Sequence, residues 1–321
     1  MDLNTIRTYA REKADEESSG FIDSDELTRH INQGLKFVYG KIVQRFENYF
    51  IVRGDQGSNP STFATTDVNT VSDEITVSRS FRTGDPVLFK TTGTLPTGLS
   101  TATTYYAIRV SSTVIKVAST QANADALTAI DLTTVGSGTH TIANSGMFNT
   151  VSETQVYNIP CDLMKFVRVE HRQNGSTSED DWLSLRSLNI ANDNVRAFYP
   201  PREGWGPGPG FGYFITGNKI NLRPTPTSVF QVRLYYIPRV AALVADSDVP
   251  GVPEEYHELL AEYGAIQMLA KSGEGLFRER SETFKLELDN LLETIEIRDQ
   301  QPEQMHITDE YDFDIIGFGP V

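Results

Sequence analysis

The stretch from residue 211 to residue 273 constrains the fold most, because it joins a strand hairpin, a third strand and a strongly marked helix. Runs typical of strands occupy residues 211–215 and 219–223, and Gly217-Asn218 lies between them. Glycine and asparagine tolerate positive φ angles, so this spacing predicts a tight hairpin turn. Residues 229–238 then alternate polar and apolar side chains, as a half-buried strand does.

The helix that follows is signalled at both ends. Pro253 suits a first helical position, and Glu254 and Glu255 lie where the helix dipole favours negative charge. Gly273 can end the helix in a left-handed conformation. Apolar residues between these signals form one stripe at three- and four-residue spacing: Tyr256, Leu259, Leu260, Tyr263, Ile266 and Ala270.

Two further regions predict helices. Near the N-terminus, residues 3–10 form a short stripe, and a longer one follows Ser24, its expected cap: Leu27, Ile31, Leu35, Val38, Ile42, Phe46 and Tyr49. The last helix is expected from residue 276 to about 298, with Phe277, Phe284, Leu288, Leu291 and Ile295 at near-heptad spacing. Only residues 273–275 separate it from the preceding helix, which predicts an antiparallel helix hairpin.

Residues 55–150 differ from the rest in being dense in Thr, Ser, Gly and Val. Strand signals occur at 73–77, 86–91, 104–110, 113–118 and 140–142. Residues 54–60 and 143–149 read as linkers at its entry and exit. We therefore predict an inserted all-β module, which costs the host little because loop-closure entropy grows slowly with length.

Composition excludes several classes of function. The net charge of −15 disfavours a protein that grips nucleic-acid phosphates, but it suits a surface that DNA passes without binding. No apolar run approaches the length of a membrane span, and the first residues lack the order of a secretory signal. The single Cys161 fits folding in a reducing cytoplasm, and packing explains it better than reactivity.

We find no pattern for catalysis, a cofactor or a metal. The acidic pairs Asp180-Asp181 and Glu254-Glu255 are sequence neighbours, whereas paired catalytic carboxylates converge across a cleft. The glycine-rich loop at 204–210 lacks the strand and helix that flank a phosphate cradle. Its Trp205 is either a loop anchor or an inter-subunit contact.

Residues 300–321 form a tail in which acids alternate with apolar side chains. Disordered segments are normally poor in aromatics, so we interpret this one as a docking tail that orders on a partner. The expected contact residues are Tyr311, Phe313, Ile315, Ile316 and Phe318. The alternative is a terminus that folds back on its own subunit.

Two resemblances extend these predictions. The sequences Thr83-Gly84-Asp85-Pro86-Val87, residues 92–100 and residues 104–110 resemble a β-module of tailed-phage tail and fibre proteins. The long N-terminal helix, the strand sequence 157–162, the hairpin 214–220 and the sequence 252–257 before the helix hairpin are together similar to head-to-tail adaptor proteins of tailed bacteriophages. The first resemblance implies a virion context and the second a structural, non-catalytic protein.

The adaptor resemblance implies a ring, expected to be a dodecamer, beneath the portal protein in the neck of the virion. The ring would continue the channel for double-stranded DNA and dock tail or nozzle proteins. Phe277, Phe284, Leu288, Leu291 and Trp205 are the expected inter-subunit contacts. The alternative is a tail-associated protein that binds a receptor or carbohydrate through the Thr-rich module.

The predicted fold class is α+β: a helical bundle with a small antiparallel sheet region and an inserted all-β domain. The expected domains are residues 1–54 and 151–299 for the adaptor core, 55–150 for the insertion and 300–321 for the docking tail.

Overall fold

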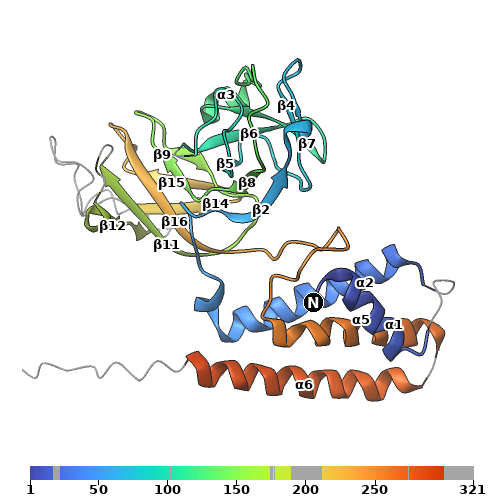
Figure 1. Cartoon of the computed structure of the whole chain (residues 1–321). Coiled ribbons are helices and arrows are strands. Elements are labelled where there is room, and N and C mark those ends of the chain that lie inside the picture. The colour runs from blue at the N-terminus through green and yellow to red at the C-terminus, as the bar shows by residue number, and fades with distance from the viewer. Residues whose placement is uncertain are drawn as a thin grey trace, which may run out of the picture. The chain divides into compact units, whose positions relative to one another are not determined.

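The computed structural model describes residues 1–16, 22–101, 103–173, 176, 178–188, 212–273 and 275–299. The chain forms two compact units: Met1–Phe46 with Ala242–Val321, and Glu47–Ala241. The first is the helical unit and the second the β unit (Figure 1). This division differs from the predicted boundaries at 54/55 and 150/151, because the β-rich segment and the later strands share one unit.

The helical unit contains α1 (Leu3–Lys13), α2 (Ser24–Arg45), the short helix η4 (Glu254–Tyr256), α5 (His257–Ser272) and α6 (Leu276–Asp299). Asp23, not the expected Ser24, caps α2, since its Oδ1 accepts a hydrogen bond from the Glu26 amide at 2.6 Å. The predicted stripe to Tyr49 is interrupted, because α2 ends at Arg45 and Tyr49 is exposed. Gly273 ends α5 in the left-handed region, as predicted.

Helix α5 packs against α1, α2 and α6. Two glycines allow these close approaches: a Cβ on Gly34 of α2 would lie 2.8 Å from the Tyr263 ring, and one on Gly264 of α5 would lie 3.1 Å from the Ala10 side chain. A buried carboxylate ties the helices together, since Glu262 of α5 pairs with Lys13 of α1 at 3.1 Å and with Arg280 of α6 at 3.3 Å.

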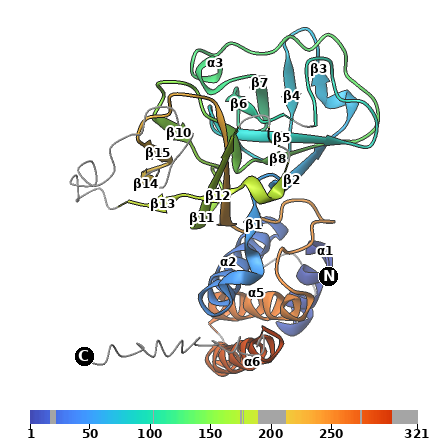
Figure 2. The same cartoon turned by 90° about the vertical axis from the view of Figure 1, so that its left-hand side faces the viewer.

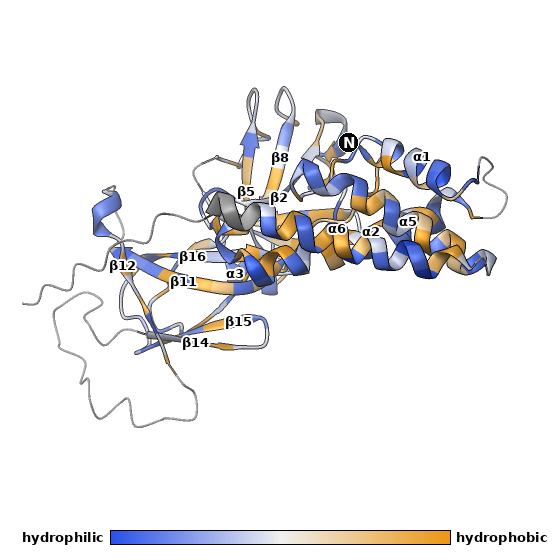
Figure 3. Ribbon diagram, turned by 90° about the horizontal axis from the view of Figure 1, so that it is seen from below, coloured by the Kyte–Doolittle hydropathy of each residue, from blue (hydrophilic) through white to orange (hydrophobic). Residues whose placement is uncertain are grey.

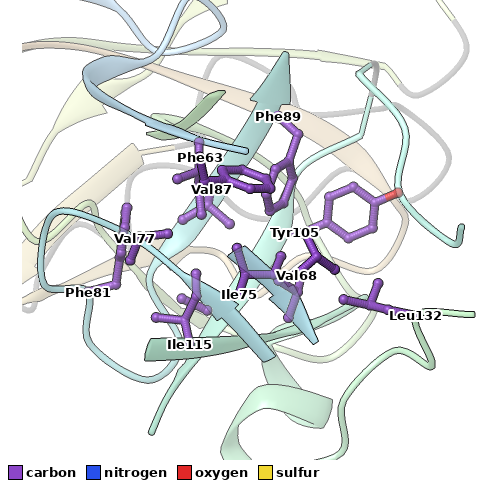
Figure 4. Packing of buried hydrophobic residues seen from close by; sticks show 13 residues of the cluster. Phe63, Val68, Ile75, Val77, Phe81, Val87, Phe89, Tyr105, Ile115 and Leu132 are labelled. Carbon is purple, nitrogen blue, oxygen red and sulfur yellow. The ribbon is translucent and has the colours of Figure 1, made fainter. Parts of the chain in front are cut away.

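The β unit begins with a seven-stranded sheet in the order β2-β8-β5-β6-β7-β4-β3. Its strands are β2 (Ser58–Phe63), β3 (Val68–Asn69), β4 (Glu74–Thr76), β5 (Pro86–Thr91), β6 (Tyr105–Arg109), β7 (Val114–Ala118) and β8 (His140–Asn144), with the short helix α3 (Gln121–Asp125) after β7. We call residues 58–144 the β-module. Its core is apolar and partly aromatic, with Phe63, Phe89 and Tyr105 in edge-to-face contacts (Figure 4).

Two other sheets, here called the host sheets, complete the β unit. One has the order β1-β16-β11-β12, with β9 also paired to β16, and the other has the order β10-β15-β14-β13 (Figure 2). Their strands are β1 (Val52–Arg53), β9 (Met147–Asn149), β10 (Val156–Asn158), β11 (Leu163–Gln173), β12 (Leu183–Ser184), β13 (Arg186–Ser187), β14 (Gly212–Thr216), β15 (Lys219–Arg223) and β16 (Phe230–Pro238). The predicted hairpin is confirmed, with Thr216 opposite Lys219 and Gly217 at φ 60°.

The prediction of linkers at 54–60 and 143–149 is wrong. Residues from Ser58 belong to β2, which pairs with β8, and residues from Met147 form β9, which pairs with β16 of a host sheet. These segments have little intrinsic strand propensity, so their pairing partners determine their conformation. The chain is mixed α+β as predicted, but three sheets make it richer in strands than a helical bundle with a small sheet.

Candidate interaction surfaces

The chain passes between the host sheets and the β-module at a crossing of two glycines. Gly54 donates to the Leu234 carbonyl at 2.9 Å, Gly146 donates to the Gly54 carbonyl at 2.9 Å, and Leu234 donates to the Gly146 carbonyl at 2.8 Å. A Cβ on Gly54 would lie 2.4 Å from the carbonyl carbon of Gly146. Only glycine fits this approach, so the crossing is fixed by backbone contacts.

A buried polar network continues this junction. Asp162 Oδ2 accepts hydrogen bonds from Ser58 Oγ and Asn59 Nδ2, each at 2.6 Å, and Ser58 Oγ also lies 2.8 Å from the Tyr236 hydroxyl. Ser58 and Asn59 belong to the β-module, whereas Asp162 and Tyr236 belong to the host. Buried polar groups that satisfy one another specify a single arrangement, so this network fixes the β-module in one orientation on the host sheets.

A second contact joins the β-module to β10. Asn158 donates from its side-chain amide to the Gly84 carbonyl at 2.9 Å, and its backbone amide donates to Gln121 Oε1 at 2.9 Å. Gly84 lies in the predicted Thr-Gly-Asp turn and has φ 85°. The turn was predicted from sequence, but nothing in its sequence indicated the partner.

The outer face of the sheet around β16 carries an arginine cluster that sequence reasoning missed. Arg233 is 3% exposed and pairs with Glu170 at 2.8 Å and with Glu179 at 3.0 Å. The pKa of Glu179 is lowered because it accepts a hydrogen bond from Arg233. Alternation along β16 correctly placed Arg233 away from the apolar core, but its burial depends on distant residues.

Trp182 lies against this cluster. The guanidinium of Arg233 is 4.1 Å from the centre of the Trp182 ring, and that of Arg172 is 4.6 Å from it. Further acids lie close by, with Asp180 and Asp181 exposed in the short helix η3 (Glu179–Asp181). The charges are therefore balanced within the chain, and the cluster stabilises the sheet rather than offering a free cationic surface.

The predicted inter-subunit residues on α6 fall into two groups. Phe284 and Leu288 are buried within their own unit, with the Phe284 ring 5.8 Å from that of Tyr263. Leu291 is half-buried, and Phe277 is 40% exposed. Hydrophobic and hydrophilic residues mix along α6 (Figure 3), and inter-subunit packing remains a prediction for Phe277 and Leu291.

The remaining predicted contact residues lie outside the described residues. These are Trp205 of the glycine-rich loop and the tail residues Tyr311, Phe313, Ile315, Ile316 and Phe318. Within the described ranges, His, Cys, Asp and Glu residues form no group of three that could hold a metal ion. Across the same ranges, no helix has the length and apolar character needed to cross a membrane.

Comparison with known families identifies the chain's class. Residues 118–308, more than half of the sequence, match the family model described as SU10 adaptor protein. The chain therefore belongs to the SU10 adaptor protein family, and it is a structural adaptor of a bacteriophage virion. The match starts at the end of β7, so it includes part of the β-module, every strand of the host sheets except β1, and α5. None of the curated proteins compared with the chain matches it.

Proposed function

We propose that this protein is the head-to-tail adaptor of its phage. Copies of it form a ring, expected to be a dodecamer, which docks beneath the portal protein and continues the DNA channel towards the tail. The observation that carries this proposal is the family match over residues 118–308. The protein acts structurally, without catalysis, cofactor or metal.

Ring closure requires each subunit to offer two different surfaces to its neighbours. Exposed apolar side chains on α6 suit one of these surfaces, since Phe277 is 40% exposed and Leu276 is 54% exposed. These residues lie in the first turn of α6, away from its buried side chains Phe284 and Leu288. We assign the first turn of α6 to a neighbouring copy.

The passage of DNA calls for a surface that does not hold the phosphate backbone. The chain carries 43 acidic residues against 28 Lys and Arg, which gives the net charge of −15. Negative charge repels the DNA backbone, so genomic DNA crosses the ring without specific binding.

The tail at 301–321 is proposed to reach the portal protein, and the β-module to face outward or towards tail and nozzle components. Deleting residues 301–321 tests the first assignment, with purified portal protein as the partner. The truncated protein is expected to lose co-sedimentation with portal while keeping its folded circular-dichroism spectrum. Full-affinity binding by the truncated protein would show that the tail is not the docking element.

A further inference from the structure

Two buried carboxyl groups lie where the β-module meets the host sheets. Asp85, in the turn before β5, is 4% exposed, and Asp162, in the turn before β11, is 5% exposed. Four other acidic residues of the β unit form ion pairs: Glu47, Asp55, Glu170 and Glu179. Among the residues that the structure describes, Asp85 and Asp162 therefore have no basic side chain as an ion-pair partner.

The thiol of Cys161 lies beside both acids. It donates to Asn144 Oδ1, with Sγ 3.5 Å from that oxygen, and it lies near enough to Asp85 for each group to shift the pKa of the other. Asp85 Oδ2 also accepts the backbone amide of Arg82 at 2.6 Å. Within the described part of the chain, Asp162 Oδ1 is buried without a hydrogen-bond partner. The junction thus buries two carboxyl groups close together without an ion-pair partner for either.

Within the described residues, the charged and titratable groups that act on Asp85 come from its own turn and from the turn before β11. Arg82 comes from its own turn, Cys161 and Asp162 come from the host turn before β11, and Arg79 acts on Cys161 from the β-module. Burial raises the pKa of Asp85 from 3.8 to about 6, and the charge of Asp162 adds to this shift, whereas the hydrogen bond from the Arg82 amide and the nearby Cys161 thiol oppose it.

We propose that this junction is a proton-operated latch, in which a proton taken from solvent by Asp85 fastens the β-module to the host sheets and its loss loosens them. The closed junction holds more protons than the open one, because the buried Asp85 binds a proton more tightly than an exposed Asp does. The closed junction is therefore most stable below about pH 4, loses stability between pH 4 and pH 6, and changes little above that range. This inference does not depend on the adaptor function.

Cys161 provides the test, because it is the only cysteine of the chain and lies half-buried at the junction. The full-length protein is labelled with a dipyridyl disulfide under native conditions from pH 4 to pH 8. Each rate is divided by the rate for the urea-unfolded chain at the same pH, which removes the intrinsic ionisation of the thiol. The quotient measures the population of the open junction.

The wild-type protein is expected to open roughly 100-fold more at pH 8 than at pH 4, because the pKa of Asp85 differs by about two units between the closed and open junctions. Asp85→Asn should give a flat profile. Asp162→Asn, which removes the neighbouring negative charge, should keep the pH dependence but move its midpoint to lower pH. As a matched control, Asn158→Ala loses the bond to Gly84 and should raise opening by the same factor at every pH.

Three results would overturn the latch. A flat wild-type profile would show that Asp85 does not control the junction. An Asp85→Asn profile as steep as the wild-type profile would assign the proton to another group. If millimolar calcium chloride at pH 8 closes the wild-type junction to the level seen at pH 4, a cation rather than a proton neutralises the acids.

Discussion

Substituting Gly54 by alanine tests whether the β-module is built into the host sheets. The added Cβ would lie 2.4 Å from the carbonyl carbon of Gly146 and 2.5 Å from its oxygen, and these backbone atoms cannot yield as a flexible side chain would. Relief requires the two strands to separate, which weakens the hydrogen bonds between Gly54, Gly146 and Leu234. Overpacking costs about 1–3 kcal/mol and each lost hydrogen bond about 1 kcal/mol, so we expect a loss of roughly 3–5 kcal/mol.

Urea unfolding followed by tryptophan fluorescence measures this loss. Trp182 lies in the β unit against Arg233, so its signal reports that unit. With a typical dependence on urea, the midpoint should fall by roughly 1–2 M. Gly40→Ala, in α2 of the helical unit, is the control: a Cβ there meets nothing within 4 Å, so the unfolding midpoint of the β unit should not fall. If the free energy of unfolding of Gly54→Ala lies within about 0.5 kcal/mol of the wild-type value, the close approach of Gly54 to Gly146 does not fix the β-module.

Three further predictions concern single side chains. Arg233→Met should lower the free energy of unfolding in urea by about 3 kcal/mol, because it leaves Glu170 buried without its closest basic partner. Adding Glu170→Leu should restore most of the loss. An unchanged urea midpoint in the single variant would contradict the buried pair. Phe284→Ala should destabilise the helical unit by about 3–5 kcal/mol, because Phe284 is buried. Phe277→Asp should change the stability by less than about 0.5 kcal/mol but weaken ring assembly. If light scattering finds a ring of normal size for Phe277→Asp, Phe277 does not belong to the interface. Gly34→Ala should lower the thermal midpoint seen by circular dichroism, and a raised midpoint would contradict the contact with Tyr263.

Local signals predicted the elements whose conformation depends on nearby residues. The turn at Gly217 and the cap at Gly273 require positive φ angles, which glycine adopts without strain, and both were predicted correctly. The apolar spacing in α2 likewise identified its buried face, whereas α5 is buried on several sides and Ala270 of its predicted stripe is exposed. In these segments the sequence pattern and the tertiary environment favour the same conformation.

Segments fixed by distant partners were predicted poorly. Ser58, Asn59 and Pro60 have low strand propensity. Ser58 is held in a strand by pairing with Asn144 of β8, and Asn59 and Pro60 lie in an irregularity before the pairing resumes at Ser61. Arg233 follows the polar alternation of β16, yet its burial depends on Trp182 and Glu179, which lie far away in sequence. The expected linkers therefore failed for the same reason that the junction acids were missed: tertiary contacts, not local pattern, define both.

The candidate site was predicted unevenly. The sequence indicated a structural protein of the adaptor type, and the family match confirms an adaptor. Phe284 and Leu288 were expected at a subunit interface because their spacing resembles an interhelical seam, but that seam faces the protein's own α5 and α2. Heptad spacing identifies a packed helix face without stating whether its partner belongs to the same chain.

Native mass spectrometry of the full-length protein, alone and mixed with its cognate portal protein, tests the adaptor account most directly. The account predicts a monomer in isolation and a closed ring, expected to be a dodecamer, on the portal assembly. A protein that stays monomeric with portal, or that binds portal without forming a ring, would contradict it.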